Sequence, residues 1–230
     1  MIELLQFPPL LGLMNASPFC MKVEVFLRLA GLEYRTVATT PVRAPKGKLP
    51  VLRDEGRTIA DSEAIIAWLQ QRYAGRMPAT LAAPETPAHH LMRRTLEEHT
   101  YFATLWYRWV DDAGWRATQG FFEGLPWGAR QMVGGLVRRK MRRDLIGQGL
   151  GRHGCDELCA RANADIDAVA AALGVQPFFG GQEPAAIDAC VYAFVANLVW
   201  VPVESPVKAH ALACAPLMDF AERMRARVGA

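Results

Sequence analysis

Hydrophobic residues in the first third of the chain fall into short runs that alternate between strand and helix patterns. Apolar, aromatic and β-branched runs predict four strands, and the last two are joined by Asp-Glu-Gly as in a hairpin. Two mostly apolar segments with capping residues in front predict helices. The expected strands are 2–7, 34–37, 51–53 and 57–59, and the expected helices begin at Pro18 and Asp61. This order predicts a mixed four-stranded sheet with helices packed on it.

After a proline-rich stretch at 75–87, strand patterns disappear and apolar residues recur at helical spacing. The expected helices cover 92–110, 129–146, 156–173, 186–201 and 217–228. We therefore expect an α/β domain over 1–76 and an all-helical domain over 85–230, joined by a linker.

Composition narrows the class of protein. The 230 residues are 51% hydrophobic and 21% charged, which is typical of a globular protein, and a net charge of +3 is too small to indicate nucleic acid binding. Five irregularly spaced cysteines favour reduced thiols in a cytoplasmic protein over a disulfide framework. We expect no signal peptide and no membrane span, since the longest apolar run, 189–203, is shorter than the roughly 20 residues a span needs.

The first helix begins with a candidate anion site. Ser17 suits the N-cap and Pro18 the first helical position, so a hydroxyl lies beside the positive end of the helix dipole. An ordinary helix cap explains the same residues. Ser17-Pro18-Phe19-Cys20 also occupies the place of the Cys-x-x-Cys motif of thioredoxin-like folds, with serine replacing the first cysteine. Ser17 could then donate a hydrogen bond to another molecule's thiolate, and we expect Cys20 to be buried.

Two further stretches have both an ordinary and a functional interpretation. Pro50 is either a harmless strand-initial proline or a cis-proline that turns the peptide group of Leu49 outward to pair with an extended peptide. Asp61 and Ser62 are either an N-cap pair or a site where the hydroxyl and helix N-terminus hold a carboxylate and Asp61 holds an ammonium group.

In their order along the chain, Ser-Pro-Phe-Cys, Leu-Pro-Val-Leu and Asp-Ser resemble the glutathione-binding half of the glutathione S-transferase superfamily. The resemblance covers essentially the whole chain, because that superfamily places an all-helical domain after a thioredoxin-like one. Stretches 6–24 and 148–153, together with Phe178-Phe179-Gly180, Pro184 and Asp188, look closest to the branch of failed-axon-connections proteins and metaxins.

The resemblance implies a role for each candidate residue. Ser17 would contact the glutathione sulfur and stabilise its thiolate, and Leu49, before Pro50, would pair with the cysteinyl backbone. Asp61 and Ser62 would hold the γ-glutamyl end. Lys48, and less surely Lys46, would face the glycyl carboxylate.

The function implied is a detoxifying transferase that conjugates glutathione to a small apolar electrophile, without a metal and with a homodimer as the superfamily's assembly. A binding or scaffold protein of the metaxin-like type is the alternative, and an oxidoreductase using Cys20 alone is a third hypothesis. One departure from the superfamily is Ala185, where Ser or Thr often caps the helix that holds the buried aspartate.

Other constellations lie outside this pattern. His153, Cys155 and Cys159 have metal-ligand spacing, but a packed helix face explains them better because a fourth ligand is missing. The basic run 138–143 is either a solvated helix face or a contact with an anionic partner or membrane surface. Tryptophans at 106, 109 and 115 are core residues or the wall of a pocket for the electrophile.

Overall fold

A computed structural model describes residues 1–122 and 124–229. A four-stranded mixed sheet forms the N-terminal domain, with strand order β2-β1-β3-β4. β1 pairs in parallel with β2 and antiparallel with β3, and β3 and β4 form the expected hairpin. The strands are β1 (Ile2–Gln6), β2 (Tyr34–Ala38), β3 (Val51–Asp54) and β4 (Arg57–Ala60). The sheet predicted from the sequence is thus confirmed.

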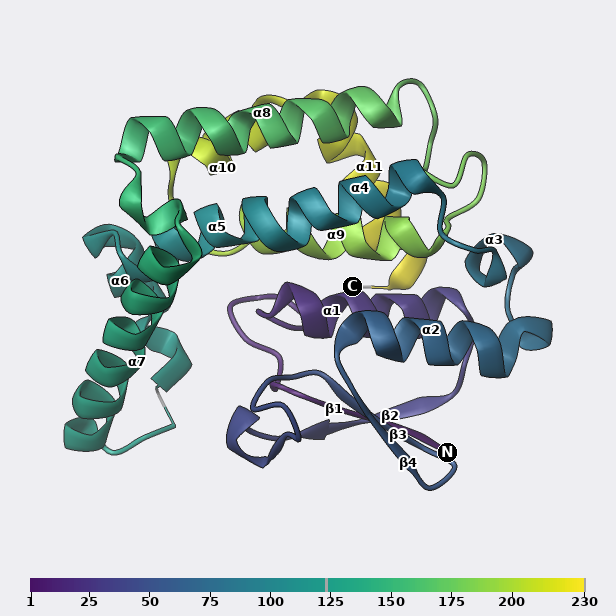
Figure 1. The fold of residues 1–230 in the computed structure, drawn as a ribbon, viewed down its shortest axis with the longest axis horizontal. Coiled ribbons are helices and arrows are strands. Elements are labelled where there is room, and N and C mark those ends of the chain that lie inside the picture. The colour runs from purple at the N-terminus through teal and green to yellow at the C-terminus, as the bar shows by residue number, and fades with distance from the viewer. Residues whose placement is uncertain (123, 230) are drawn as a thin grey trace.

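Two helices, α1 (Pro18–Leu29) and α2 (Ser62–Tyr73), lie between this sheet and the helical domain (Figure 1). Nine of the twelve residues of α1 are buried, and Lys22 and Glu24 are among them. It ends as the sequence indicates, with Gly31 at a φ of +64° just after the last turn.

The C-terminal domain is helical, as expected, and most of its helices form a layer above α1 (Figure 1). Helix α9 is its apolar centre, since every residue from Ile187 to Val199 is buried, and it packs directly on α1. The α-helices are α3 (Ala79–Ala82), α4 (Pro87–Thr95), α5 (Tyr101–Trp109), α6 (Asp112–Thr118), α7 (Trp127–Gln148), α8 (Cys155–Leu173), α9 (Ala186–Val199), α10 (Pro206–Ala213) and α11 (Ala215–Val228).

The structure corrects four details of the predicted helices. Helix α3 lies inside the stretch expected to be a linker, and α6 and α10 were not predicted. The single helix expected at 92–110 is two, because a π-helical turn at Leu96–Thr100 separates α4 from α5. Helix α10 begins with Ser205-Pro206, the same cap signal as α1, but its eight residues are too few for a clear apolar period.

Candidate functional site

Three segments with candidate residues leave the sheet at the same edge. In the register of the strands, Leu5 of β1 lies opposite Val51 of β3, which lies opposite Ala60 of β4. The loop to Ser17 follows β1, Leu49 and Pro50 immediately precede β3, and Asp61 immediately follows β4. The sheet therefore brings together candidate residues that lie up to 45 positions apart in the sequence.

Ser17 is the N-cap of α1, and Pro18 is the first helical residue. Its hydroxyl oxygen accepts a hydrogen bond from the Cys20 amide at 3.4 Å, and its own amide donates to Asn15 Oδ1 at 3.0 Å. Because the hydroxyl is the acceptor in this contact, the Cys20 amide does not use its proton, which can be donated to a ligand or to the Cys20 sulfur. The side chain is half-buried, and the first amides of α1 point toward the same end of the helix.

Cys20 faces the interior, as the sequence analysis expected. It is fully buried in a small apolar cluster with Leu5, Leu49 and Val51. Burial raises the pKa of its thiol to about 12, although hydrogen bonds from Ser17 and the peptide of Phe7 oppose this shift. Cys20 therefore remains a protonated thiol at neutral pH, which argues against a redox role for Cys20 alone.

The peptide bond between Leu49 and Pro50 is cis, as the functional interpretation of this proline requires. The side chain of Leu49 is buried next to Cys20, while its backbone amide and carbonyl make no hydrogen bond to any described residue. This peptide group is thus available to an extended ligand. On the loop before it, Lys46 and Lys48 are exposed.

At the start of α2, Asp61 has a φ of +98°, an unusual conformation for a residue with a side chain. One of its carboxylate oxygens accepts hydrogen bonds from the amides of Glu63 at 2.9 Å and Ala64 at 3.3 Å, so the N-cap interpretation holds. Ser62 is buried, and its hydroxyl makes no hydrogen bond to a described residue. The second carboxylate oxygen of Asp61 and the hydroxyl of Ser62 are therefore available to a ligand.

Arg108, at the end of α5, is a component of the site that sequence reasoning missed. Its guanidinium is 4% exposed and donates to the carbonyl oxygen of Ala16 at 3.1 Å and to the carbonyl of Asn197 on α9. Among the described residues, no carboxylate is a partner of Arg108, and its Nε makes no hydrogen bond. Burial lowers the pKa of this side chain to about 10. A cation with no counter-ion in the described ranges therefore contacts Ala16, the residue before Ser17. The sequence feature that could have indicated a buried charge here is a single arginine within the aromatic run from Trp106 to Trp109.

A second buried group of charges joins the domains near α2. Arg93 of α4 donates to Glu63 at 2.9 and 3.0 Å, to Glu85 at 2.7 and 2.9 Å and to Glu97 at 3.3 Å, and Glu97 also pairs with Lys22 at 2.5 Å. Hydrogen bonds from Arg93 hold the pKa of the Glu85 carboxyl below its usual value. Because Glu63 directly follows Ser62, this group fixes the start of α2 against the helical domain.

Two other candidates have structural partners. Cys155 is exposed and lies 3.6 Å from the Tyr107 hydroxyl, and no three His, Cys, Asp or Glu side chains in the described ranges gather into a possible metal site. Asp188 is fully buried and accepts hydrogen bonds from the amides of Phe179, Gly180 and Ala185, at 2.7 to 3.0 Å. It therefore fixes the loop before α9 even though Ala185 provides no side-chain cap.

Comparisons with known proteins agree with this architecture. The family model described as glutathione S-transferase N-terminal domain matches residues 18–114, and the model described as glutathione S-transferase, C-terminal domain matches 162–224. Among solved structures, a glutathione S-transferase of Ceriporiopsis subvermispora in complex with glutathione superposes with a TM-score of 0.67 at 20% identity, covering 100% of this chain and 98% of that one.

Sequence relatives fall into the branch expected from the motifs. The isoprene-epoxide–glutathione S-transferase of Rhodococcus sp. (strain AD45) is 30% identical, with 98% of both chains covered. Failed axon connections of Drosophila melanogaster is 28% identical over 86% of this chain and 50% of that protein, and human metaxin-2 is 18% identical over 81% of this chain and 72% of its own length. With both family models and a full-length relative in agreement, the chain belongs to the glutathione S-transferase family.

Proposed function

We propose that this protein binds glutathione at the sheet edge and transfers its thiolate to a small apolar electrophile. The observation that carries the proposal is the free peptide group of Leu49, which is joined to a cis-proline and packed beside Cys20, at the same edge as Ser17. An extended tripeptide that pairs with Leu49 would place its cysteinyl sulfur near the start of α1. The γ-glutamyl end of the tripeptide would then lie near the start of α2, and its glycyl carboxylate would lie near the loop that carries Lys46 and Lys48.

The two ends of the ligand have complementary groups nearby. Ser62 and the first amides of α2 would receive the γ-glutamyl carboxylate, and Asp61, whose carboxylate is exposed, would attract the ammonium group. Lys48, and Lys46 to a lesser extent, would attract the glycyl carboxylate. These side chains are exposed, so we expect each contact to contribute modestly to affinity.

Ionisation of the thiol would be the main chemical task of the site. A hydrogen bond to an anion contributes about 1.5–3 kcal/mol, and a helix N-terminus adds about 0.3–1 kcal/mol. One pKa unit corresponds to about 1.4 kcal/mol, so Ser17 and α1 together could lower the thiol pKa by about two units from about 8.5. The buried charge of Arg108 acts in the same direction.

The electrophile class follows from the relative that is 30% identical, whose name gives isoprene epoxide as its substrate. For an epoxide, the sulfur would attack a ring carbon, a C–S bond would form as the C–O bond breaks, and the alkoxide would take a proton from water. Phe19 and Tyr101 are half-buried and pack on the buried Phe194, with ring centroids 4.9 to 6.1 Å apart, so they would form an apolar wall beside the start of α1.

The test is titration of the bound glutathione thiol by its ultraviolet thiolate absorbance, in the wild type, Ser17→Ala and Ser17→Gly. Both variants should raise the thiol pKa by about one to two units. Glycine is a better N-cap than alanine, so Ser17→Gly removes the hydroxyl with a smaller loss of helix stability than Ser17→Ala. Comparing the two variants separates the effect of the hydroxyl from the effect of helix stability. The matched control, Ser62→Ala, should weaken binding without changing the thiol pKa.

An unchanged thiol pKa in both Ser17 variants would remove the role proposed for Ser17. If glutathione binds with a lowered thiol pKa but neither an epoxide nor an aryl halide is conjugated, the alternative of a non-catalytic binding protein is the better description.

A further inference from the structure

Helix α7 projects from the helical layer, and its N-terminal end is the free end of the projection (Figure 1). Its 22 residues span about 33 Å. Only Gly134 and Leu145 are buried on it, and Arg138 anchors it by donating to the carbonyls of Trp109 and Val110. Most of the helix surface is therefore open to the surroundings.

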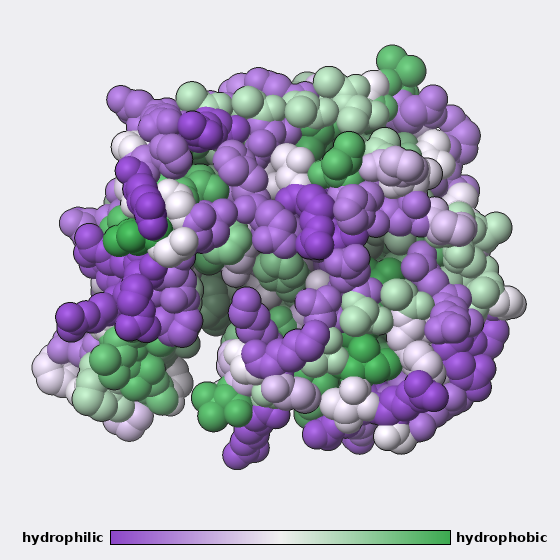
Figure 2. All heavy atoms as spheres, viewed as in Figure 1, coloured by the Kyte–Doolittle hydropathy of each residue, from purple (hydrophilic) through white to green (hydrophobic). Residues whose placement is uncertain are grey.

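The free end of this projection is apolar. Leu125, Trp127, Met132 and Leu136 are 39%, 77%, 63% and 62% exposed. With Ile146, they make up five of the ten large hydrophobic residues that are exposed in the described chain, within about a tenth of its length. Figure 2 shows hydrophobic side chains gathered at the lower-left end of the molecule, below a band of hydrophilic ones. We call the side chains of Leu125, Trp127, Met132 and Leu136 the apolar tip. An exposed apolar patch of this kind indicates an interaction surface.

Directly behind the apolar tip lies a basic collar formed by Arg139, Lys140, Arg142 and Arg143, all exposed. Helix α7 carries six basic residues and one acidic residue, a local charge of +5, whereas the whole chain has a net charge of +3. The rest of the chain therefore carries a net charge of −2, and the positive charge is concentrated on this helix.

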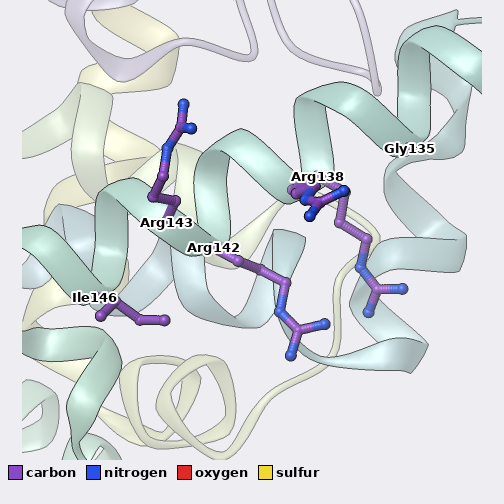
Figure 3. A pocket seen from close by; sticks show the side chains of 6 residues that line it. Gly135, Arg138, Arg142, Arg143 and Ile146 are labelled. Atoms are coloured by element: carbon purple, nitrogen blue, oxygen red, sulfur yellow. The ribbon is translucent and has the colours of Figure 1, made fainter.

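Arginines of the collar also line a shallow hollow on the surface of α7. The hollow has a volume of about 510 Å³ and is lined by Gly135, Arg138, Arg139, Arg142, Arg143 and Ile146. Figure 3 shows Arg142 and Arg143 extending away from the helix. Arg139 and Arg143 make no ion pair or hydrogen bond with any described residue, so their charges are available to a partner.

We propose that the apolar tip and basic collar of α7 dock on an anionic phospholipid membrane surface. The tip would enter the boundary between headgroups and acyl chains, where Trp127 prefers to lie, and the collar would meet the lipid phosphates at headgroup depth. The apolar residues lie at the free end of the helix and the arginines lie behind them, which matches a bilayer in which the acyl chains lie deeper than the lipid phosphates. This docking is peripheral, since no helix in the described ranges is long and apolar enough to span a membrane.

Charge distinguishes this partner from the others. A symmetric contact with a second copy through α7 would bring together two helices that each carry a local charge of +5, which is unfavourable. A nucleic acid would pair with the arginines but would leave the exposed aliphatic side chains of Met132 and Leu136 in water. Of these three partners, only an anionic bilayer uses both parts of the surface.

The experiment is co-sedimentation of the full chain with vesicles of phosphatidylcholine alone and of phosphatidylcholine with about 30% phosphatidylserine. We expect at least about tenfold tighter binding to the anionic vesicles, weakened as salt shortens the Debye length. The variant Arg139→Glu/Arg142→Glu/Arg143→Glu should lose about a hundredfold or more, since each arginine near an anionic surface contributes about fivefold. Met132→Ser/Leu136→Ser should weaken binding while keeping the salt dependence.

The matched control reverses three exposed arginines elsewhere, Arg43→Glu/Arg94→Glu/Arg161→Glu, and should retain most of the vesicle binding. Circular dichroism and thermal unfolding should show that all variants are folded. Three outcomes would overturn the proposal: no binding to anionic vesicles, equal loss in the control and collar variants, or tighter binding to a duplex oligonucleotide than to the vesicles. Concentration-dependent dimerisation abolished by Met132→Ser/Leu136→Ser, without vesicle binding, would assign the tip to self-association instead.

Discussion

Arg108 and Ala16 join the helical domain to the loop that carries Ser17, through a hydrogen bond of 3.1 Å from the guanidinium to the Ala16 carbonyl. A buried cation without a carboxylate partner is costly, and such a group often marks a functional site. Here a ligand thiolate at Ser17 would supply the missing negative charge.

Replacing Arg108 with Met should therefore raise the pKa of the thiol of bound glutathione by about one unit, which corresponds to about 1.4 kcal/mol. Activity should fall more at slightly acidic pH than at alkaline pH, because the thiolate fraction falls only below the raised pKa. Arg108→Lys keeps the charge and should restore part of the shift. A thiol pKa that is unchanged in Arg108→Met, measured on protein that still binds glutathione, would limit Arg108 to a structural role.

Lys48 should contribute affinity through the glycyl carboxylate alone. Because the side chain is exposed, we expect Lys48→Ala to weaken glutathione binding about two- to fivefold, with the effect reduced at high salt. Calorimetry with glutathione and with its glycyl ester provides the control, since the ester should bind both proteins equally. Equal weakening for both ligands would show that Lys48 does not contact this carboxylate.

The cysteines should differ strongly in their reactivity toward iodoacetamide. Burial raises the pKa of both Cys20 and Cys190 to about 12, so both should be protected in the native protein, whereas the exposed Cys155 should react first. Mass spectrometry after a short pulse at mildly alkaline pH measures this, with unfolded protein as the control in which all five react. Labelling of Cys20 as fast as Cys155 would revive the hypothesis of an oxidoreductase.

Arg93 should be important for stability because it joins Glu63, Glu85 and Glu97 in a mostly buried group. Arg93→Ala should cost about 3–5 kcal/mol in the free energy of unfolding. The neighbouring Arg94, whose pair with Glu98 is exposed, is the control, and Arg94→Ala should cost about 1 kcal/mol or less.

The same group predicts a pH dependence. The pKa of Glu85 is lowered in the folded state by Arg93, so its stabilising contribution is present above its unfolded pKa and is lost as pH falls through the folded one. The difference in urea stability between the wild type and Arg93→Ala should therefore stay constant from neutral pH to about pH 5 and shrink as the pH falls below about 4.5. A constant difference would mean that the carboxylates contribute little.

Restoring the missing cap of α9 should stabilise the protein. Ala185 has the extended backbone of an N-cap but no side-chain acceptor, so Ala185→Ser should add about 1 kcal/mol in urea unfolding. Ala186→Ser, one position into the helix, is the matched control and should not stabilise. A loss of stability in Ala185→Ser would show that the loop held by Asp188 cannot accommodate the hydroxyl.

Local sequence patterns determined the two-part architecture. Alternating strand and helix signals predicted the four strands, and the Ser17-Pro18 cap and the Gly31 stop fixed both ends of α1, because caps and turns depend on residues next to each other in the chain. The order of the short motifs also predicted the family and the cis bond before Pro50.

Only the tertiary structure decided which charges would be buried and what they would contact. Lys22, Arg93 and Arg108 belong to helices that pair across the two domains, and no local pattern indicates that their partners lie 75, 30 and 92 positions away. The register that aligns Leu5, Val51 and Ala60 likewise depends on strands distant in sequence. The placement of these groups is set by packing between elements, which the sequence encodes only through the whole fold.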